Sequence, residues 1–267
     1  MRMIQELMSL EGRVAIVTGG AGYIGSAFCE ALAEVGANLV VLDIEPEKCD
    51  STATSIASKY GIETLSINID LADEQQLSSV HERVLDRFGR IDILVNCAAV
   101  VGTSNLKGLN NDFIDQQSHT WRHVIEVNLN AIFVLTQICV PSLKASGKGS
   151  IINISSIYGV VGPDMRLYRG TSMGNSAAHS VSKGGLLQFT RWLATVLAPE
   201  IRVNAITPGG VWRNQNKRFV KRYIDQTPLN RMAKEEDLKG AIVYLASDMS
   251  AYVTGQNILV DGGWTAW

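Results

Sequence analysis

Residues 14–25 read VAIVTGGAGYIG, an apolar run of strand-forming residues followed by a glycine-rich turn. A helical pattern begins at residue 23, so this order predicts a buried strand, a tight turn and a helix whose free N–H groups face outward. Gly19 permits the turn, Gly22 lets the backbone approach a pyrophosphate, and Gly25 lets the helix pack against the strand. The stretch predicts a dinucleotide site, with an ordinary tight turn as the alternative.

The next expected strand ends on an acidic residue. The run NLVVL at residues 38–42 leads to Asp43, 18 residues after Gly25. The carboxylate of Asp43 can accept hydrogen bonds from both hydroxyls of an adenosine ribose, and it would repel a 2′-phosphate. The first basic residue after it is Lys48. NAD is therefore expected in preference to NADP, and capping of the following turn is a second, compatible role for Asp43.

Short β-rich runs alternate with amphipathic stretches along the rest of the chain. Strands are expected at residues 13–18, 38–43, 62–69, 91–96, 149–155, 201–207 and 257–260, and helices at 23–36, 46–60, 73–88, 118–145, 176–198 and 235–247. This alternation predicts an α/β fold, in which one domain over residues 13–267 forms a doubly wound parallel sheet of about seven strands with helices on both faces. Residues 1–12 are expected to form a flexible leader. Segments 100–118 and 157–175 follow strand ends, where loops often carry substrate specificity.

The composition excludes several classes of protein. Of the 267 residues, 46% are hydrophobic, which suffices for a packed core, and the net charge of −2 provides no basic field for nucleic acid. The longest apolar stretch, residues 124–143, contains Glu126, Asn128 and Asn130, so no membrane span is expected and the protein is expected to be cytoplasmic. Four cysteines are scattered without CxxC spacing or paired histidines, so neither a disulfide framework nor a metal site is expected.

Several further motifs resemble those of the short-chain dehydrogenase/reductase family, in its shorter branch. They are Asp70, NCAA at 96–99, VNL at 127–129, ISS at 154–156, TPGG at 207–210 and VDGGW at 260–264. The resemblance implies a Rossmann-type fold, a homotetramer and a nicotinamide cofactor. Residues implied to bind this cofactor are Gly19, Gly22, Tyr23, Ile24, Gly25, Asp43, Asp70, Leu71, Asn96, Ala98, Ala99, Lys183, Pro208, Gly209 and Val211.

Two features depart from the family pattern, and one narrower resemblance bears on the substrate. The glycine spacing matches the sugar-nucleotide epimerase branch, and the usual Thr after the PG motif is replaced around Arg213. The 157–175 insertion, TPLNRM at 227–232 and the VDGGWTAW end are similar to bacterial flagellin-modification protein A, which implies a sugar or sugar-phosphate substrate. Basic residues in the segment where the family builds its substrate lid suit phosphate or carboxylate, with a solvated helix face as the alternative. These residues are Arg213, Lys217, Arg218, Lys221 and Arg222.

The family's catalytic residues carry over to this chain with one exception. The resemblance implies Asn128 as the holder of a water relay, Ser156 as the residue that orients the reacting oxygen, and Lys183 as the ligand of the nicotinamide ribose. The Tyr expected four residues before Lys183 is His179. Hydride transfer needs a group that moves the substrate's hydroxyl proton, so this role falls to His179. A bound small molecule, and no nucleic acid or membrane, is the expected partner.

The chemistry of His179 differs from that of a tyrosine. Four residues apart on a helix, His179 and Lys183 share a face, and the ammonium disfavours an imidazolium beside it. A neutral imidazole accepts a proton from an alcohol, which predicts a bias towards oxidation. The ring ends about 2 Å short of a tyrosine oxygen, so a water or a shifted substrate must fill the gap. Tyr158 and Tyr168 are candidate replacements for the missing phenol, with surface packing as the alternative.

Three functions remain open on the sequence. The first is an NAD-dependent oxidoreductase that interconverts a secondary alcohol and a ketone, with a sugar derivative as the favoured substrate. The second is a protein that binds NAD but has weak or lost catalysis, because the most diagnostic side chain is absent. The third is a sugar-nucleotide epimerase or dehydratase, indicated by the glycine spacing.

Overall fold

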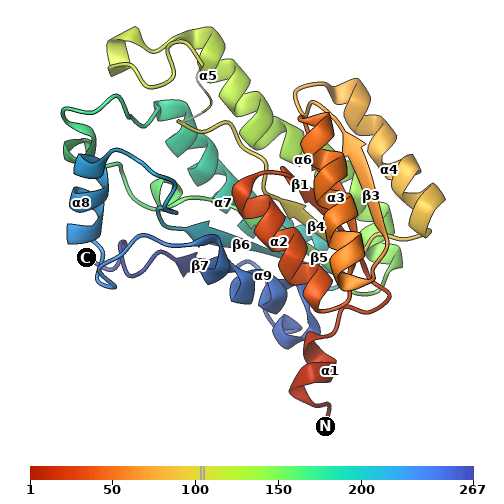
Figure 1. Cartoon of the computed structure of the whole chain (residues 1–267). Helices are drawn as coiled ribbons and strands as arrows, with labels where there is room; N and C mark the ends of the chain where they lie inside the picture. The colour runs from red at the N-terminus through yellow and green to blue at the C-terminus, as the bar shows by residue number, and fades with distance from the viewer. Residues whose placement is uncertain (103, 105) are drawn as a thin grey trace.

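The computed structural model describes residues 1–102, 104 and 106–267. Within them, seven parallel strands form one sheet in the order β3-β2-β1-β4-β5-β6-β7. The strands are β1 (Val14–Thr18), β2 (Asn38–Asp43), β3 (Thr64–Asn68), β4 (Ile93–Asn96), β5 (Gly149–Ile154), β6 (Ile201–Pro208) and β7 (Asn257–Val260). This confirms the predicted doubly wound, Rossmann-type fold (Figure 1). The strand order reverses between β1 and β4, and such a point opens a ligand crevice at the carboxyl edge.

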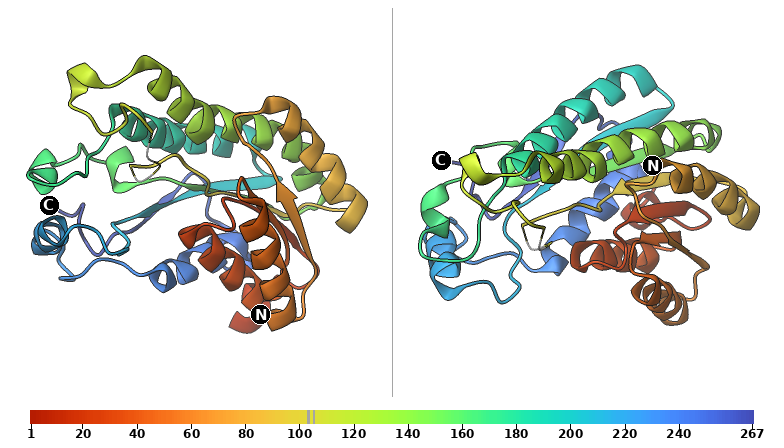
Figure 2. Two further views of the ribbon diagram at one scale, coloured as in Figure 1. Left: turned by 45° about the horizontal axis from the view of Figure 1, so that its top comes forward. Right: turned by 90° about the horizontal axis from the view of Figure 1, so that it is seen from above.

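Helices cover both faces of the sheet because successive strand residues point to opposite sides. Ala15 and Val17 pack with one helical layer, whereas Val14 and Ile16 pack with the other. The first layer contains α2 (Tyr23–Glu34), α3 (Pro46–Tyr60) and α9 (Lys239–Ala246), and the second contains α4 (Glu74–Phe88), α6 (Ala131–Ala145) and α7 (Ala177–Leu197). Figure 2 shows the two layers on either side of the strands.

The expected helix at 118–145 is interrupted. It consists of α5 (Ser118–Ile125), a π-helical turn η2 (Glu126–Asn130) and α6. By length and apolar composition alone, Ser118–Ala145 could cross a membrane. In this fold α6 packs against the sheet and α4, and α5 packs against α7, as helices of a protein core do.

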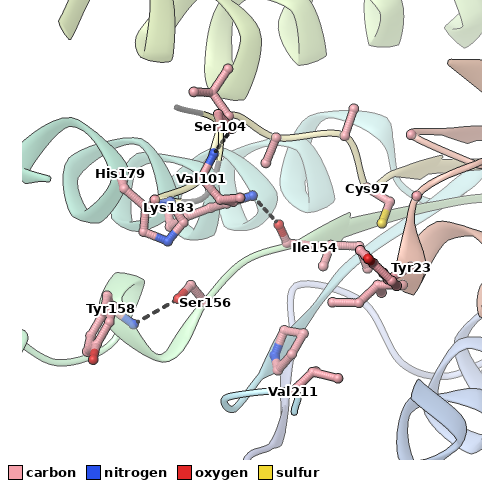
Figure 3. Close-up of a pocket in the computed structure, with 18 of the residues that line it drawn as sticks. Tyr23, Cys97, Val101, Ser104, Ile154, Ser156, Tyr158, His179, Lys183 and Val211 are labelled. Atoms are coloured by element: carbon pink, nitrogen blue, oxygen red, sulfur yellow. Dashed lines mark hydrogen bonds between the residues drawn. The ribbon is translucent and has the colours of Figure 1, made fainter. Parts of the chain in front are cut away.

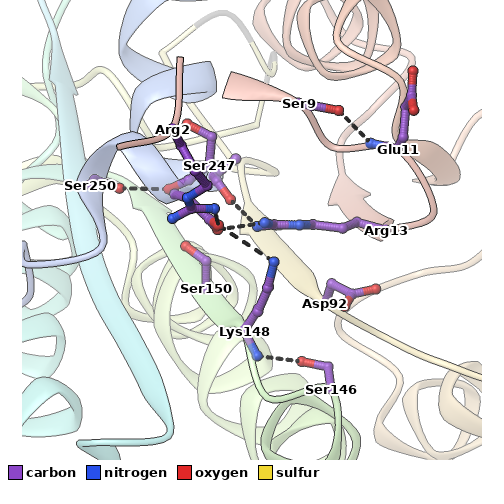
Figure 4. A network of polar contacts seen from close by, with 12 residues as sticks. Arg2, Ser9, Glu11, Arg13, Asp92, Ser146, Lys148, Ser150, Ser247 and Ser250 are labelled. Atoms are coloured by element: carbon purple, nitrogen blue, oxygen red, sulfur yellow. Dashed lines mark hydrogen bonds and ion pairs between the residues drawn. The ribbon is translucent and has the colours of Figure 1, made fainter. Parts of the chain in front are cut away.

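Two short helices were not expected from the sequence. Helix α1 (Ile4–Met8) lies in the segment expected to be a flexible leader, and Leu10 after it is fully buried. Arg2 and Arg13 both pair with Asp248, which Lys148 also approaches (Figure 4). Helix α8 (Lys217–Asp225) has four basic residues in nine, and its basic and apolar residues alternate in pairs at helical spacing. It nevertheless buries two aromatic residues, Phe219 and Tyr223.

Candidate active site

A cavity of about 910 Å³ lies along the carboxyl edge of the sheet, where the strand order reverses. One end is formed by the glycine turn after β1 and by Asp43 at the end of β2. The other end contains Ser156, His179 and Lys183. The single cavity therefore joins the two groups of residues that the sequence predicted for the cofactor and for the reaction.

The glycine turn has no room for side chains. A Cβ on Gly25 would lie 2.0 Å from the carbonyl oxygen of Gly19, and Gly19 itself has φ 64° with Ala98 Cα 2.9 Å from its would-be Cβ. Gly22 is the N-cap of α2 and brings no capping side chain. The first N–H groups of α2 are thus left open towards the cavity, as a phosphate site requires.

Asp43 braces this turn. Its Oδ2 accepts a hydrogen bond of 3.0 Å from the N–H of Ala21, and its Oδ1 accepts one of 3.2 Å from the N–H of Glu45. The second contact is the turn cap that the sequence left open as a compatible role. The carboxylate also lines the cavity. Each oxygen keeps a further lone pair, so the expected contact with a ribose is chemically available.

Most of the other expected cofactor residues line the same cavity. They are Gly19, Gly22, Tyr23, Ile24, Gly25, Asp70, Leu71, Ala98, Ala99, Pro208, Gly209 and Val211. Asn96 is the exception, because it is 1% exposed and is absent from the cavity wall. Its Nδ2 donates to Oδ1 of Asn153 at 2.8 Å, so the side chain joins β4 to β5 within the sheet. The sequence could not separate a cavity amide from one that bonds a neighbouring strand.

The end of β5 is tied closely to α7. Ser156 caps the short helix η3 (Ile157–Gly159), and its Oγ accepts the N–H of Tyr158 at 3.2 Å. The Oγ of Ser155 donates to the carbonyl of Lys183 at 3.0 Å. A Cβ on Gly159 would lie 2.7 Å from the carbonyl carbon of Lys183, so only glycine allows this approach. These contacts place Ser156 beside the reactive part of α7.

Lys183 is buried near the start of α7. Its side chain is almost enclosed, at 3% exposure for the residue, and Nζ donates to the carbonyl of Ile154 at 2.7 Å. Burial lowers the pKa of Lys183 to about 8, because the charged ammonium has lost most of its water. The lysine is therefore a well-positioned donor whose charge is only partly retained at alkaline pH.

His179 lies one turn before Lys183. The N–H of His179 donates to Oγ of the N-cap residue Ser176 at 3.2 Å, which fixes the start of the helix. Burial lowers the pKa of the imidazole to about 4, and the charge of Lys183 adds to the effect, against a backbone contact with Val100. The sequence attributed a neutral imidazole to Lys183, whereas burial is the larger cause. Figure 3 shows the ring beside Lys183 and facing Ser156.

The Nδ1 atom of His179 is buried and has no hydrogen-bond partner within the described residues. An unpartnered buried polar atom is costly unless a ligand or a water satisfies it. A neutral imidazole has one acceptor nitrogen and one N–H, so His179 keeps capacity for a further hydrogen bond. Its surroundings thus suit a proton acceptor more than an imidazolium donor.

Asn128 lies behind the cavity wall. It is fully buried in the π-helical turn, and its side chain accepts the N–H of Val100 at 2.7 Å and donates to the carbonyl of Val100 at 3.0 Å. It also approaches Oγ of Ser182 at 3.3 Å. Asn128 was expected to hold a water relay. In the structure its side-chain amide fixes the backbone at Val100, which lines the cavity and contacts His179, and the water relay stays a prediction.

Tyr158 and Tyr168 form a buried pair. Their hydroxyl oxygens are 2.7 Å apart, and burial raises the pKa of both phenols, that of Tyr168 to about 12. In Figure 3 the phenol oxygen of Tyr158 points away from His179. Both residues pack in an aromatic cluster with Trp264 and line the cavity, so their packing role is found in the cavity wall and not on the outer surface. Neither phenol is prepared to ionise as a catalytic tyrosine must.

The sequence missed the aromatic wall around this pair. Phe219 and Tyr223 of α8 pack with Tyr168 and with Trp264, and the hydroxyl of Tyr223 accepts the N–H of Gly210 at 2.6 Å. Phe219 and Tyr223 lie four residues apart on α8, so an apolar stripe at helical spacing was the available signal. The insertions contribute polar groups to the same region, through Asn110, Ser172 and Asn175.

The five basic residues assigned to a substrate lid have separate roles. Arg213 lines the cavity. Arg222 donates to the backbone carbonyls of Arg166, Leu167 and Arg169, so it fastens α8 to the 157–175 insertion. The remaining three are exposed and absent from the cavity wall, as the alternative of a solvated helix face predicts: Lys217, Arg218 and Lys221.

Comparison with known proteins decides the family. A family model described as enoyl-(acyl carrier protein) reductase matches residues 19–265. A 3-oxoacyl-(acyl-carrier-protein) reductase of Thermotoga maritima is 34% identical over 262 residues, covering 96% of this chain and 99% of the relative. The chain belongs to the short-chain dehydrogenase/reductase family. A post-translational flagellin modification protein A of Campylobacter coli, 30% identical over 96% of this chain and 99% of its own, bears out the narrower resemblance seen in the sequence.

Solved members of the short-chain dehydrogenase/reductase family share the whole fold. A short-chain dehydrogenase from Leptospira borgpetersenii with bound NAD+ has a TM-score of 0.84 and 35% identity, covering 99% of this chain and 96% of its own. A gluconate 5-dehydrogenase from Burkholderia cenocepacia in complex with NADP and tartrate has a TM-score of 0.88 and 27% identity, covering 99% and 100%. The chain is therefore an oxidoreductase of alcohols and ketones that uses a nicotinamide cofactor.

Proposed function

We propose that this enzyme uses NAD to interconvert a secondary alcohol and a ketone on a sugar derivative or a related small polar molecule, with His179 as the proton-exchanging residue. One observation carries the proposal. His179, Ser156 and Lys183 line the same cavity as the glycine turn and Asp43. The turn fits a dinucleotide, because a Cβ on Gly25 would fill the space in which the backbone folds tightly against α2.

A bound nicotinamide supplies the site that accepts or donates the hydride. In the oxidation direction, the hydroxyl of Ser156 donates a hydrogen bond to the substrate oxygen and orients it. The neutral imidazole of His179 would accept the hydroxyl proton of the alcohol, and a bound nicotinamide would accept the hydride from the carbon, which leaves a ketone. The ammonium of Lys183 would hold the hydroxyls of the nicotinamide ribose.

The resting protonation state of His179 is the one from which oxidation starts. With its pKa lowered to about 4, the imidazole is neutral at physiological pH and can accept a proton. Reduction would need an imidazolium as the donor, and burial makes that form scarce. We therefore propose an enzyme that works mainly as a dehydrogenase.

NAD is the proposed cofactor because Asp43 stands where an adenosine ribose meets the end of β2. A carboxylate there favours free ribose hydroxyls and repels a 2′-phosphate. The Leptospira relative holds NAD+, whereas the Burkholderia relative holds NADP, so the choice within the family depends on local residues. In this chain the local residue is Asp43.

The proposed substrate class rests on two observations. Asn110, Ser172 and Asn175 bring amide and hydroxyl groups to the cavity from the two insertions. Relatives include a flagellin modification protein and a gluconate 5-dehydrogenase in complex with tartrate. A polyol, a sugar or a sugar acid would use such groups, while the aromatic wall of Tyr158 and Tyr168 would pack against its ring or chain.

The test is a screen of polyols, sugars, sugar acids and sugar phosphates, followed by the absorbance of reduced nicotinamide with NAD and with NADP. Wild-type protein is compared with His179→Tyr, and with Lys217→Gln as an exposed control outside the cavity. Turnover that survives unchanged in His179→Ala would remove His179 from the mechanism. A preference for NADP would remove the role of Asp43.

A second candidate function is cofactor binding without turnover. The observation in its favour is that Nδ1 of His179 is shielded from solvent, so a substrate has restricted access to it. Tight binding of NADH with no turnover across the screen, and turnover restored in His179→Tyr, would establish it. The relatives described above that name an activity are a reductase and dehydrogenases, so the epimerase alternative loses its support.

We also propose that the enzyme is a cytoplasmic homotetramer. The four cysteines are free, which suits a reducing compartment. Large apolar side chains are exposed on α6 and α7, and they supply the kind of surface that subunits bury: Phe133, Val181, Trp192 and Val196. Light scattering coupled to size exclusion measures the assembly, and a monomeric mass would refute the tetramer.

A further inference from the structure

Arg213 occupies an unusual position beside the glycine turn. It follows β6, and its guanidinium lies 4.5 Å from the centroid of the Tyr23 ring. Tyr23 is the first residue of α2, whose N-cap Gly22 carries no capping side chain. Arg213 and the glycine turn line the same cavity. A cation thus lies against the side chain of the residue that begins α2, on the wall of the same cavity.

This arrangement is unfavourable in the absence of an anion. The N-terminus of a helix carries a partial positive charge, and cations are stabilising at the opposite end. Glu235 forms an ion pair of 3.2 Å with Nη2 of Arg213. The Nε of Arg213 is buried and has no partner within the described part of the chain. The guanidinium therefore has a donor in reserve.

The arginine is also held in place before any ligand arrives. The backbone N–H of Arg213 donates to Oε1 of Gln215 at 2.7 Å, and Nε2 of Gln215 donates to the carbonyl of Val211 at 2.7 Å. The guanidinium also stacks over the ring of Tyr23. A pre-positioned arginine loses less freedom on binding, so more of its interaction appears as affinity.

We propose that Arg213 is a ligand of the cofactor pyrophosphate, paired with the N–H groups at the start of α2. The inference rests on the proposed function, because it concerns the same dinucleotide. Oxygen atoms shared between a planar guanidinium and a helix N-terminus satisfy both groups. It also gives a physical meaning to the replacement, around Arg213, of the Thr that is usual after the PG motif.

The proposal separates the parts of the cofactor. NADH and ADP contain the pyrophosphate, whereas adenosine contains only the base and the ribose. Replacing the guanidinium of Arg213 should weaken the binding of NADH and ADP and leave the binding of adenosine unchanged. Because a charge-assisted hydrogen bond is lost, we expect a decrease in affinity of about tenfold or more.

The experiment is isothermal titration of NADH, ADP and adenosine into wild-type protein, Arg213→Gln, Arg213→Lys and the control Lys217→Gln. Lys217 is exposed and lies outside the cavity wall, so the control loses a neighbouring positive charge only. We expect Arg213→Gln to lose affinity for NADH and ADP alone, Arg213→Lys to recover part of it, and Lys217→Gln to match wild type. Thermal unfolding without ligand establishes that each variant is folded.

Two results would overturn the inference. One is unchanged affinity of Arg213→Gln for NADH and ADP while wild type binds both. The other is an equal loss for adenosine, which would indicate general damage to the site. Wild-type protein that binds neither NADH nor NADPH would overturn the proposed function instead.

Discussion

Acidification should destabilise the fold through His179, and the size of this effect follows from its burial. The pKa of the imidazole is lowered from 6.5 to about 4 in the folded protein. Between these values the unfolded chain binds the proton and the folded chain does not, so the free energy of unfolding rises with pH. The contribution is fully present above pH 6.5 and is lost as pH falls towards 4.

The magnitude follows from the width of this window. A shift from 6.5 to about 4 spans 2.5 pH units. At about 1.4 kcal/mol for each unit, full acidification would remove about 3 kcal/mol of stability. This is a large fraction of the 5–15 kcal/mol that typically separates a folded domain from its unfolded chain, about a third of it.

The assay is the free energy of unfolding from urea titrations at a series of pH values between 7 and 4, without cofactor. The variant is His179→Gln, which keeps a polar side chain and removes the titrating ring. His119→Gln is the control, because it removes an exposed imidazole. Subtracting the variant curve from wild type cancels the carboxylates that both proteins share.

We expect the difference in unfolding free energy between wild type and His179→Gln to fall by about 3 kcal/mol as the pH falls across this range, and the His119→Gln control to follow wild type. A difference curve that stays flat from pH 6.5 to 4 would refute the reasoning. Equal acid sensitivity of both histidine variants would refute it as well.

Three further predictions concern the cofactor and the reaction. Gly25→Ala should lower the unfolding temperature and abolish NADH binding measured by calorimetry, since its Cβ would meet the oxygen of Gly19 at 2.0 Å, whereas Gly61→Ala meets no neighbouring atom and should keep NADH binding. For oxidation, the kcat/KM of wild type should stay constant from pH 7 to about 5, whereas the kcat/KM of His179→Tyr should rise with pH because a phenol must ionise. A decline in the kcat/KM of wild type across that range counts against His179. Asp43→Asn should narrow the preference for NAD over NADP by about tenfold or more in steady-state kinetics, and an unchanged ratio would dismiss the carboxylate.

Much of the fold could be predicted because residue types mark the ends of its elements. The expected bounds of β2, β7 and α3 coincide with those of the structure, where Asp43, Pro46 and Gly61 delimit them. The π-helical turn at 126–130 was invisible, since the apolar pattern continues through it. Its position depends on buried contacts of Asn128 with Val100, which is distant in the sequence.

The residues of the candidate site likewise divide into those that the sequence could predict and those that it could not. Residues whose backbone geometry is unusual, such as Gly19 and Gly25, could be assigned from the sequence because few other residues fit there. Asn96 could not, because a buried amide on one strand serves equally well as a link to the next. The pairing of Tyr158 with Tyr168 could not be predicted, because the motif couples a catalytic phenol to a lysine one helical turn away. The partner of each phenol is instead a tyrosine ten residues along the insertion.

The polar chain that crosses the sheet has a consequence for how such an enzyme can change. Nδ2 of Asn153 donates to Oγ1 of Thr190, and Oγ1 of Thr190 donates to the carbonyl of Leu186. These two hydrogen bonds connect β5 to the middle of α7. Together with the close contact at Gly159, these hydrogen bonds anchor the reactive helix to the sheet through residues outside 160–175, and Asn175 adds a hydrogen bond to Ser180 of the helix. Residues 160–175 can consequently be replaced by a different loop that accepts a different molecule, while the groups that handle the proton keep their spacing.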